Sequence, residues 1–268
     1  MPASERDAAF GPEHAEVYEL TYRHRGKDWG AEAAEVTRRI RDHRPRARSL
    51  LDVACGTGAH LEAFRAGFDH VEGLELSRAM RERAVRRLPG VTVHDGDMRG
   101  FDLGRAFDAV TCLYTAIAYL PTVAAMRAAV RAMAGHLVPG GVLVIEPWWP
   151  PERFIEGFVG ADLVRDGDTV VARVSHSTRR DRAAHMDVRW TVGRPAGVRA
   201  FRTVETFTMF TADEFRAAFQ DSGCDVEHEE AGLNGYGLFV GVRRGRPEAR
   251  EGREGREATD ATRPSAGT

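Results

Sequence analysis

The segment 50–58, with the sequence LLDVACGTG, constrains the fold of this chain more than any other stretch. Its apolar residues predict a parallel β-strand that is buried on both faces, because such strands read as nearly continuous hydrophobic runs. Gly56 and Gly58 then permit a tight turn in which a ligand can lie against bare backbone. A helix predicted to begin near Ala59 would present free N–H groups to polar ligand atoms. We therefore expect an α/β sheet with a ligand at this turn.

The residues around this turn discriminate between two cofactors, a dinucleotide and S-adenosylmethionine (SAM). The dinucleotide fingerprint G-x-G-x-x-G needs a third glycine where this chain has Leu61. Leucine is too large for the close helix–strand packing that this glycine provides. Asp52 adds a carboxylate beside the turn, which suits a ligand with an ammonium group and no phosphate. The pattern resembles motif I of class I SAM-dependent methyltransferases, with a purely structural strand–turn–helix as the alternative.

Acidic residues follow the next two predicted strands, at 71–76 and 91–94, in positions that suit the rest of this cofactor. Glu75 lies roughly 20 residues after the turn, where a carboxylate can bind both ribose hydroxyls. In methyltransferases the position of Asp97 typically faces the adenine amino group, with an apolar neighbour such as Met98 against the ring. A surface carboxylate and a loop cap are the alternatives for the two acids. The predicted cofactor contacts are Tyr22, Arg25, Asp52, Ala54, Gly56, Gly58, Glu75, Leu76, Asp97, Met98 and Leu113.

Two helices are predicted before the turn, at 13–23 and 29–43. They either pack on the sheet or form a lid over the cofactor, since basic turns such as the one between them are often merely solvated. As a lid they would direct four side chains to the site, namely Tyr18, Tyr22, Arg25 and Lys27.

The strands predicted at 107–113 and 142–145 both end in aromatic segments. Tyr119 follows the first of them, and the run Glu146-Pro147-Trp148-Trp149 follows the second. Ligands of open α/β folds bind at this carboxyl edge of the sheet. The segment around Trp149 therefore indicates a wall for the acceptor, with a packed corner as the alternative.

The residue composition of the sequence changes from Asp168 onward. Residues 169–178, 185–192 and 198–210 are rich in β-branched and aromatic side chains and predict a small antiparallel sheet. A helix at 211–222 and a hairpin of 224–228 with 238–242 would return the chain to the main sheet.

The expected fold class is α/β, a Rossmann-like methyltransferase sheet with helices on both faces and an inserted small antiparallel β subdomain. We expect a disordered N-terminus at 1–9 and a SAM-binding core with the lid helices at 10–150. The inserted acceptor-binding subdomain would occupy 151–210, and 211–243 would return to the core. Residues 244–268 almost lack apolar side chains, which predicts a disordered tail.

The amino-acid composition limits the classes of function that this chain can have. The net charge of −2, from 38 basic and 40 acidic residues, gives no electrostatic case for nucleic acid binding. The three cysteines lack the spacing of metal ligands and suit a reduced cytosol, so we expect no metal and a cytoplasmic location. No signal peptide or apolar run of about 18 residues is apparent, so no membrane partner is expected.

Several longer segments carry a closer resemblance. They are RGKD at 25–28, GLELS at 73–77, GDMR at 96–99, EPWW at 146–149, RVSHS at 173–177 and GLF at 237–239. Over residues 10–243 the chain resembles the actinobacterial N,N-dimethyltransferases of nucleotide-linked amino sugars. The resemblance implies an enzyme that N-methylates the amine of a dTDP-linked amino sugar in natural-product biosynthesis, using SAM and in-line transfer with positioning as the main catalytic effect.

The resemblance also implies the acceptor residues, because the turn after the fifth strand and the inserted strands form that pocket in the family. Tyr119 would orient the amine or act as a weak base, and His176 is a second catalytic candidate. Arg173 would be the partner for a phosphate. The family often has Tyr, His and Arg where this chain has Phe10, Tyr119 and Tyr236. The implied acceptor contacts are Tyr18, Trp149, Arg173, Ser175, His176, Ser177 and Tyr236.

Other functions stay open on the sequence alone. A methyltransferase could act on another small molecule, such as an aminoglycoside or a nucleoside, and O-methylation would need a base or metal to ionise a hydroxyl. A non-catalytic SAM-binding protein is a second alternative, and Leu61 disfavours a dinucleotide oxidoreductase. The oligomeric state is also open, with a homodimer as one option.

Overall fold

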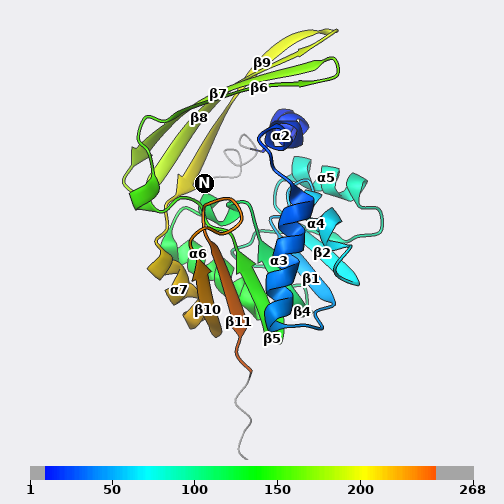
Figure 1. The fold of residues 1–268 in the computed structure, drawn as a ribbon, viewed down its shortest axis with the longest axis vertical. Helices are drawn as coiled ribbons and strands as arrows, with labels where there is room; N and C mark the ends of the chain where they lie inside the picture. Colours follow the sequence, from blue (N-terminus) through cyan, green and yellow to red (C-terminus); the bar gives the residue numbers. More distant parts are fainter. Residues whose placement is uncertain (1–9, 246–268) are drawn as a thin grey trace, which may run out of the picture.

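The computed structural model describes residues 10–245 and contains two β-sheets (Figure 1). The larger sheet has seven strands in the order β10-β11-β5-β4-β1-β2-β3. Strands β1 to β5 run parallel, whereas β11 is antiparallel to β5 and β10 is antiparallel to β11. The strand bounds are β1 Ser49–Val53, β2 His70–Glu75, β3 Val93–Asp95, β4 Phe107–Cys112, β5 Leu137–Ile145, β10 Cys224–Glu229 and β11 Leu238–Arg243. The predicted disordered ends, 1–9 and most of 244–268, lie outside the described residues.

Helices cover both faces of this sheet. Leu50 and Leu51 of β1 belong to different hydrophobic clusters, because successive side chains of a strand point to opposite faces. Leu50 packs with helices α3 and α4, and Leu51 packs with α6 and α7. The helix bounds are α3 Trp29–His43, α4 Ala59–Phe64, α5 Arg78–Arg87, α6 Val123–Gly135 and α7 Ala212–Asp221. This arrangement confirms the predicted Rossmann-like sheet.

The second sheet contains four antiparallel strands in the order β6-β7-β8-β9 and lies at one end of the molecule (Figure 1). Helix α2, Pro12–His24, lies between this sheet and the rest of the protein, and its Val17 packs against Trp190 and the valines of the sheet's inner face. The strand bounds are β6 Val159–Asp166, β7 Thr169–Arg180, β8 Ala183–Arg194 and β9 Gly197–Thr208. The predicted antiparallel insertion is therefore present.

Two strand predictions were wrong in extent. Strand β6 begins at Val159, before the change of composition at Asp168, and the sequence analysis did not predict this strand. Strand β5 begins at Leu137 and includes Gly140, whereas the predicted strand began at residue 142. Gly140 adopts a φ of +71°, and the register between β4 and β5 shifts in this region, so an irregular strand accommodates the residue.

Within residues 10–245, no helix is both long and apolar enough to cross a bilayer. The same residues contain no group of three or more His, Cys, Asp and Glu side chains arranged to hold a metal ion. Cys55, Cys112 and Cys224 are buried and form no disulfide. The candidate chemistry therefore has to be sought in the side chains that line cavities.

Candidate active site

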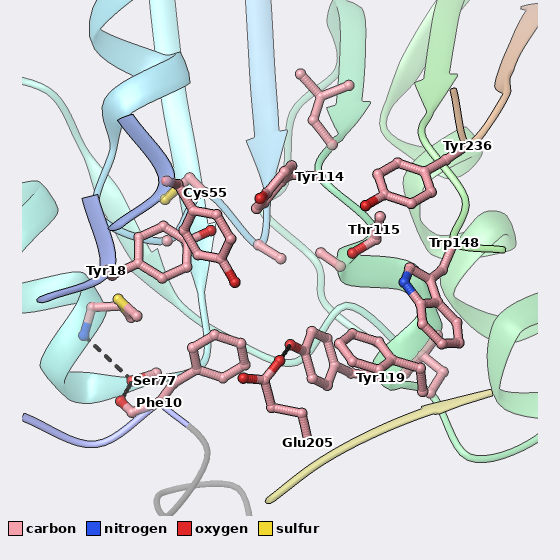
Figure 2. Close-up of a pocket in the computed structure, with 18 of the residues that line it drawn as sticks. Phe10, Tyr18, Cys55, Ser77, Tyr114, Thr115, Tyr119, Trp148, Glu205 and Tyr236 are labelled. Carbon is pink, nitrogen blue, oxygen red and sulfur yellow. Dashed lines mark hydrogen bonds between the residues drawn. The ribbon is translucent and has the colours of Figure 1, made fainter. Parts of the chain in front are cut away.

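A cavity of about 590 Å³ is lined by residues of both sheets (Figure 2). One part of its wall comes from the glycine turn and from the segments that follow β2, β3 and β4. The other part comes from α2, the turn after β5, and strands β7, β8 and β9. Most of the predicted cofactor and acceptor residues thus share one enclosure, which is the arrangement needed for a transfer reaction.

The glycine turn has the geometry of a ligand contact at Gly56. Gly56 has a φ of +58°, a conformation that favours glycine, and a Cβ added there would meet no atom within 4 Å. The backbone at Gly56 therefore borders open space in the cavity. Gly58 has a different role from the one predicted, since it does not line the cavity. A Cβ added to Gly58 would meet Ala84 at 3.1 Å and Leu88 at 3.0 Å, so this glycine permits close packing against α5.

Glu75 links the turn to the end of β2. Its carboxylate accepts hydrogen bonds from the backbone N–H groups of Gly56, at 2.8 Å, and Ser77, at 2.7 Å. Burial raises the pKa of Glu75, and these hydrogen bonds act in the opposite direction. A carboxylate has about four acceptor positions, so two remain for ligand hydroxyls. Glu75 both shapes the turn and lines the cavity.

Asp52 presents a nearly uncompensated carboxylate to the same part of the cavity. It is 2 % exposed and accepts one hydrogen bond from the Thr111 hydroxyl, at 2.7 Å. Burial, together with the negative charge of Glu75, raises its pKa to about 7. No cationic side chain among residues 10–245 forms an ion pair with Asp52. A cationic group of a ligand would therefore find a matching partner here.

Asp97 and Met98 line the cavity after β3, as predicted for the adenine end. Both carboxylate oxygens of Asp97 accept hydrogen bonds from the Arg99 side chain, at 3.0 Å from its Nε. Because Arg99 already binds this carboxylate, the contact between Asp97 and adenine is a proposal. Leu76, Leu113, Tyr22, Ala54 and Arg25 also line the cavity.

Strained backbone is concentrated at this site. Ala54, Tyr114 and Thr115 have φ values of +57°, +49° and +62°, although none of them is glycine. Such conformations cost about 1–3 kcal/mol each and persist where the surroundings impose them, often at functional sites. All three residues line the cavity, at the carboxyl ends of β1 and β4. The strain therefore coincides with the edge at which open α/β sheets bind ligands.

On the acceptor side, two arginines share one carboxylate. Arg25 binds Asp162 of β6 through its Nε, at 2.9 Å, and Arg173 binds the other oxygen of Asp162, at 3.3 Å. Arg173 is 3 % exposed, its Nη2 contacts only the weak acceptor Met186 Sδ, and its Nε has no partner among the described residues. Two guanidinium groups beside one carboxylate leave excess positive charge in the wall, which suits an anionic ligand group.

The prediction that His176 contacts the acceptor was wrong. Within the segment 173–177 of β7, Arg173, Ser175 and Ser177 are buried, whereas Val174 and His176 are exposed. Alternate residues of a strand face opposite sides of the sheet, so the side chain of His176 lies outside the cavity. Ser175 and Ser177 line the cavity, as predicted.

A further correction concerns Lys27, which was considered as a lid residue facing the site. Its Nζ forms an ion pair with Glu32 and lies 3.7 Å from the centroid of the Tyr114 ring. His60 Nε2 lies 2.8 Å from the same carboxylate oxygen of Glu32, Oε2. Lys27 therefore does not line the cavity but supports Tyr114, which does.

Glu205 is the main site residue that the sequence analysis missed. It occupies an inward position of β9, and its Oε2 accepts a hydrogen bond from the Tyr119 hydroxyl, at 3.0 Å (Figure 2). Burial, together with the charge of Glu205, raises the pKa of Tyr119, so the phenol stays protonated at neutral pH. This geometry favours the orienting role of Tyr119 over the role of a base. One sequence feature could have identified Glu205. It is an acidic residue between Thr203 and Phe207, in a strand whose side chains alternate between the two faces of the sheet.

Trp149 forms the wall that the sequence predicted after β5. Its ring packs against Tyr236 with 4.6 Å between centroids, and the guanidinium of Arg153 lies 4.3 Å from its ring centroid. All three residues line the cavity. The neighbouring Trp148 also lines the cavity, and its ring stacks on Phe207 of β9.

Comparisons with known proteins identify the family. The model of the methyltransferase domain family matches residues 50–141. A dTDP-4-amino-2,3,4,6-tetradeoxy-D-glucose N,N-dimethyltransferase from Saccharopolyspora spinosa is 51% identical over 90% of this chain and 96% of its own length. A dTDP-3-amino-3,4,6-trideoxy-alpha-D-glucopyranose N,N-dimethyltransferase from Streptomyces venezuelae is also 51% identical, over 86% of this chain and 98% of its own. The SAM-bound structure of an amino pentose methyltransferase from Micromonospora echinaspora, involved in calicheamicin biosynthesis, is 61% identical, with a TM-score of 0.80 over 85% of this chain and 96% of that one.

Proposed function

Because the chain belongs to the class I SAM-dependent methyltransferases, and within them to the family of these sugar N,N-dimethyltransferases, we propose that it N-methylates the amine of a dTDP-linked amino sugar in natural-product biosynthesis. It is a SAM-dependent enzyme. The observation that carries the proposed acceptor is the shared cavity, which joins the glycine turn and Glu75 to the excess positive charge at Arg173.

The residues at the glycine turn fit SAM, which supplies an electrophilic methyl group when bound. Asp52 offers an unpaired carboxylate for the cofactor's ammonium group. Glu75 keeps free acceptor positions for the ribose hydroxyls, and Gly56 lets the ligand approach bare backbone. Met98 provides an apolar surface for the adenine ring.

The inserted sheet fits a nucleotide-linked acceptor, and we propose residues 151–210 as the acceptor-binding subdomain. Arg173 and Arg25 supply positive charge for the diphosphate, and the hydroxyls of Ser175 and Ser177 supply hydrogen bonds. The paired rings of Trp149 and Tyr236 provide a flat surface for the nucleotide-sugar. The buried, free cysteines support a reducing compartment, so we propose a cytoplasmic location.

Positioning is the main catalytic contribution that these residues can make. An amine is a good nucleophile once it is neutral, so the protein mainly has to hold it in line with the methyl group. Correct placement of two reactants can supply ~7–11 kcal/mol of barrier reduction. Tyr119, fixed by its hydrogen bond to Glu205, is suited to orient the acceptor.

The acceptor class is tested by incubating the purified protein with SAM and three kinds of acceptor, followed by mass spectrometry. The acceptors are dTDP-linked amino sugars, the matching dTDP-linked hydroxy sugars, and free aminoglycosides or nucleoside amines. We expect methylation of the first kind alone. Methylation of a free amine without any reaction of a dTDP-amino sugar would overturn the proposed acceptor, and binding of SAM without any methylation would favour a non-catalytic role.

SAM affinity is expected to fall as the pH drops through 7. The pKa of Asp52 is raised to about 7, so below that pH the carboxyl becomes neutral and loses its attraction for the cofactor's ammonium group. The ionised fraction falls about eightfold between pH ~7.5 and pH ~6, and we expect the affinity to fall by a similar factor. Calorimetry at several pH values measures this. The Asp52→Asn variant should bind more weakly and show a flat profile, and a flat profile in the wild type would contradict the assignment.

Replacement of Tyr119 by phenylalanine is expected to lower turnover by only about tenfold, or ~1.4 kcal/mol. The change removes the hydrogen bond to Glu205 but keeps the ring that packs against Phe10 and Phe207. Because the pKa of Tyr119 is raised, its phenol should not govern the pH profile of the wild type near neutrality. Single-turnover measurements across pH test this, and a loss of several thousandfold would identify Tyr119 as a base.

A further inference from the structure

Glu205 is a buried anion in the acceptor half of the cavity. It lies on β9 opposite Met186 of β8, at an inward position, and is 3 % exposed. One carboxylate oxygen accepts the Tyr119 hydrogen bond at 3.0 Å, and the other lies on the side of Phe10 (Figure 2). Tyr119 is the residue proposed above to orient the acceptor amine, and Phe10 packs against its ring. Glu205 therefore lies beside the expected place of the reacting nitrogen.

The carboxylate of Glu205 has no ion-pair partner in the part of the chain that the structure describes. Among residues 10–245 the neutral phenol of Tyr119 is its one hydrogen-bond partner. Two other buried acids are better satisfied, since Glu75 accepts two backbone N–H groups and Glu146 accepts one N–H and the Asn234 amide. Asp52, at the cofactor end of the cavity, resembles Glu205 in accepting a single side-chain hydrogen bond. Arg173 forms its ion pair with Asp162 and none with Glu205. A buried carboxylate with so little compensation is unfavourable unless a cation joins it.

The surroundings of Glu205 suit an organic ammonium group. The rings of Phe10 and Phe207 both pack against Tyr119, with centroids 5.0 Å and 4.7 Å from it, and Trp148 stacks on Phe207. Apolar walls exclude water and so strengthen an ion pair, and aromatic faces attract cations directly. Aromatic walls also accept N-methyl groups, so the pocket remains suitable after the first methyl transfer.

We infer that Glu205 first binds the acceptor amine as an ammonium ion, before the nitrogen loses a proton and becomes the nucleophile, and so makes the enzyme select an amine over a hydroxyl at the methylated position. This inference rests on the proposed function and adds the group that recognises the acceptor nitrogen. A hydroxyl at the same position can donate one neutral hydrogen bond to Glu205 but cannot neutralise its charge. Charge-assisted hydrogen bonds are roughly twice as strong as neutral ones, which gives the selection its physical basis.

The test measures binding in the presence of S-adenosylhomocysteine, so that no turnover occurs. The two ligands are a dTDP-linked amino sugar and its hydroxy counterpart, identical except at the amine. We expect Glu205→Gln to reduce the preference for the amine by about tenfold or more at neutral pH, with the affinity for the hydroxy sugar changed by less than about threefold. Glu205→Asp should recover part of the preference. Glu227→Gln changes an exposed glutamate of β10 that does not line the cavity, and it should leave both affinities unchanged.

The outcomes separate this inference from the proposed function. If the wild type binds the amino sugar and Glu205→Gln keeps the same preference for the amine, Glu205 is not the recognition group although the proposed function stands. Equal losses for both sugars in Glu205→Gln, with unchanged S-adenosylhomocysteine affinity, would show a structural role instead. If the wild type binds neither sugar, the proposed acceptor and the inference both fail.

Discussion

Replacing Arg173 with glutamine is expected to weaken binding of a dTDP-linked amino sugar by about 100-fold or more. Arg173 is buried in the cavity wall, and its guanidinium has an unpartnered Nε and an Nη2 that meets only a sulfur atom. Hydrogen bonds to charged groups contribute about 1.5–3 kcal/mol, and removing one partner of a buried charge pair costs about 2–5 kcal/mol. Glutamine keeps a polar side chain but is shorter and removes the charge. Equilibrium binding of the dTDP-sugar in the presence of S-adenosylhomocysteine measures the effect.

Arg189→Gln is the matched control for this variant, because Arg189 is an exposed arginine of β8 that lies outside the cavity. It should bind the dTDP-sugar as the wild type does. Arg173→Lys keeps the charge but loses the forked geometry, so we expect an intermediate loss. The affinity for SAM should stay within about threefold in all three variants, since Arg173 contributes to the acceptor side. A dTDP-sugar affinity that is unchanged in Arg173→Gln would place the diphosphate elsewhere.

The cofactor half of the site was predictable because its signals are local in sequence. Asp52 and Gly56 belong to one strand–turn segment, and Glu75 ends the next strand, so order along the chain fixes their places at the sheet edge. Gly58 shows the limit of this reasoning. Its neighbours Ala84 and Leu88 come from α5, and the sequence pattern did not reveal that the glycine serves helix packing.

The acceptor half was less predictable because its contacts join distant segments. The pairing of Arg25 with Asp162 spans 137 positions, and that of Tyr119 with Glu205 spans 86, so neither follows from a motif. The motif at 173–177 correctly indicated a strand of the inserted sheet. It could not indicate which of its side chains face the cavity. A strand alternates its faces, and the structure shows that Arg173 points inward and His176 outward.

Replacing Trp149 with alanine is expected to impair the enzyme more than Tyr119→Phe does. The indole of Trp149 lies in the cavity wall and contacts both the Tyr236 ring and the Arg153 guanidinium. Alanine therefore removes the central member of a surface made by three residues. Loss of a buried aromatic anchor typically costs ~2–3 kcal/mol, which corresponds to about 30- to 150-fold in affinity. We expect this loss mainly in the KM for the dTDP-sugar.

The physical reason for a KM effect is that Trp149 contacts no group that changes charge during methyl transfer, so it should stabilise bound substrate and transition state alike. Trp149→Phe keeps an aromatic face and should recover most of the affinity, whereas the affinity for SAM should be unchanged in both variants. Steady-state kinetics with the dTDP-sugar varied at saturating SAM separates KM from kcat. A KM for Trp149→Ala within about threefold of the wild type would show that the nucleotide-sugar does not lie against this wall. A fall confined to kcat would instead indicate that Trp149 acts on the placement of the amine, together with Tyr119 and Glu205.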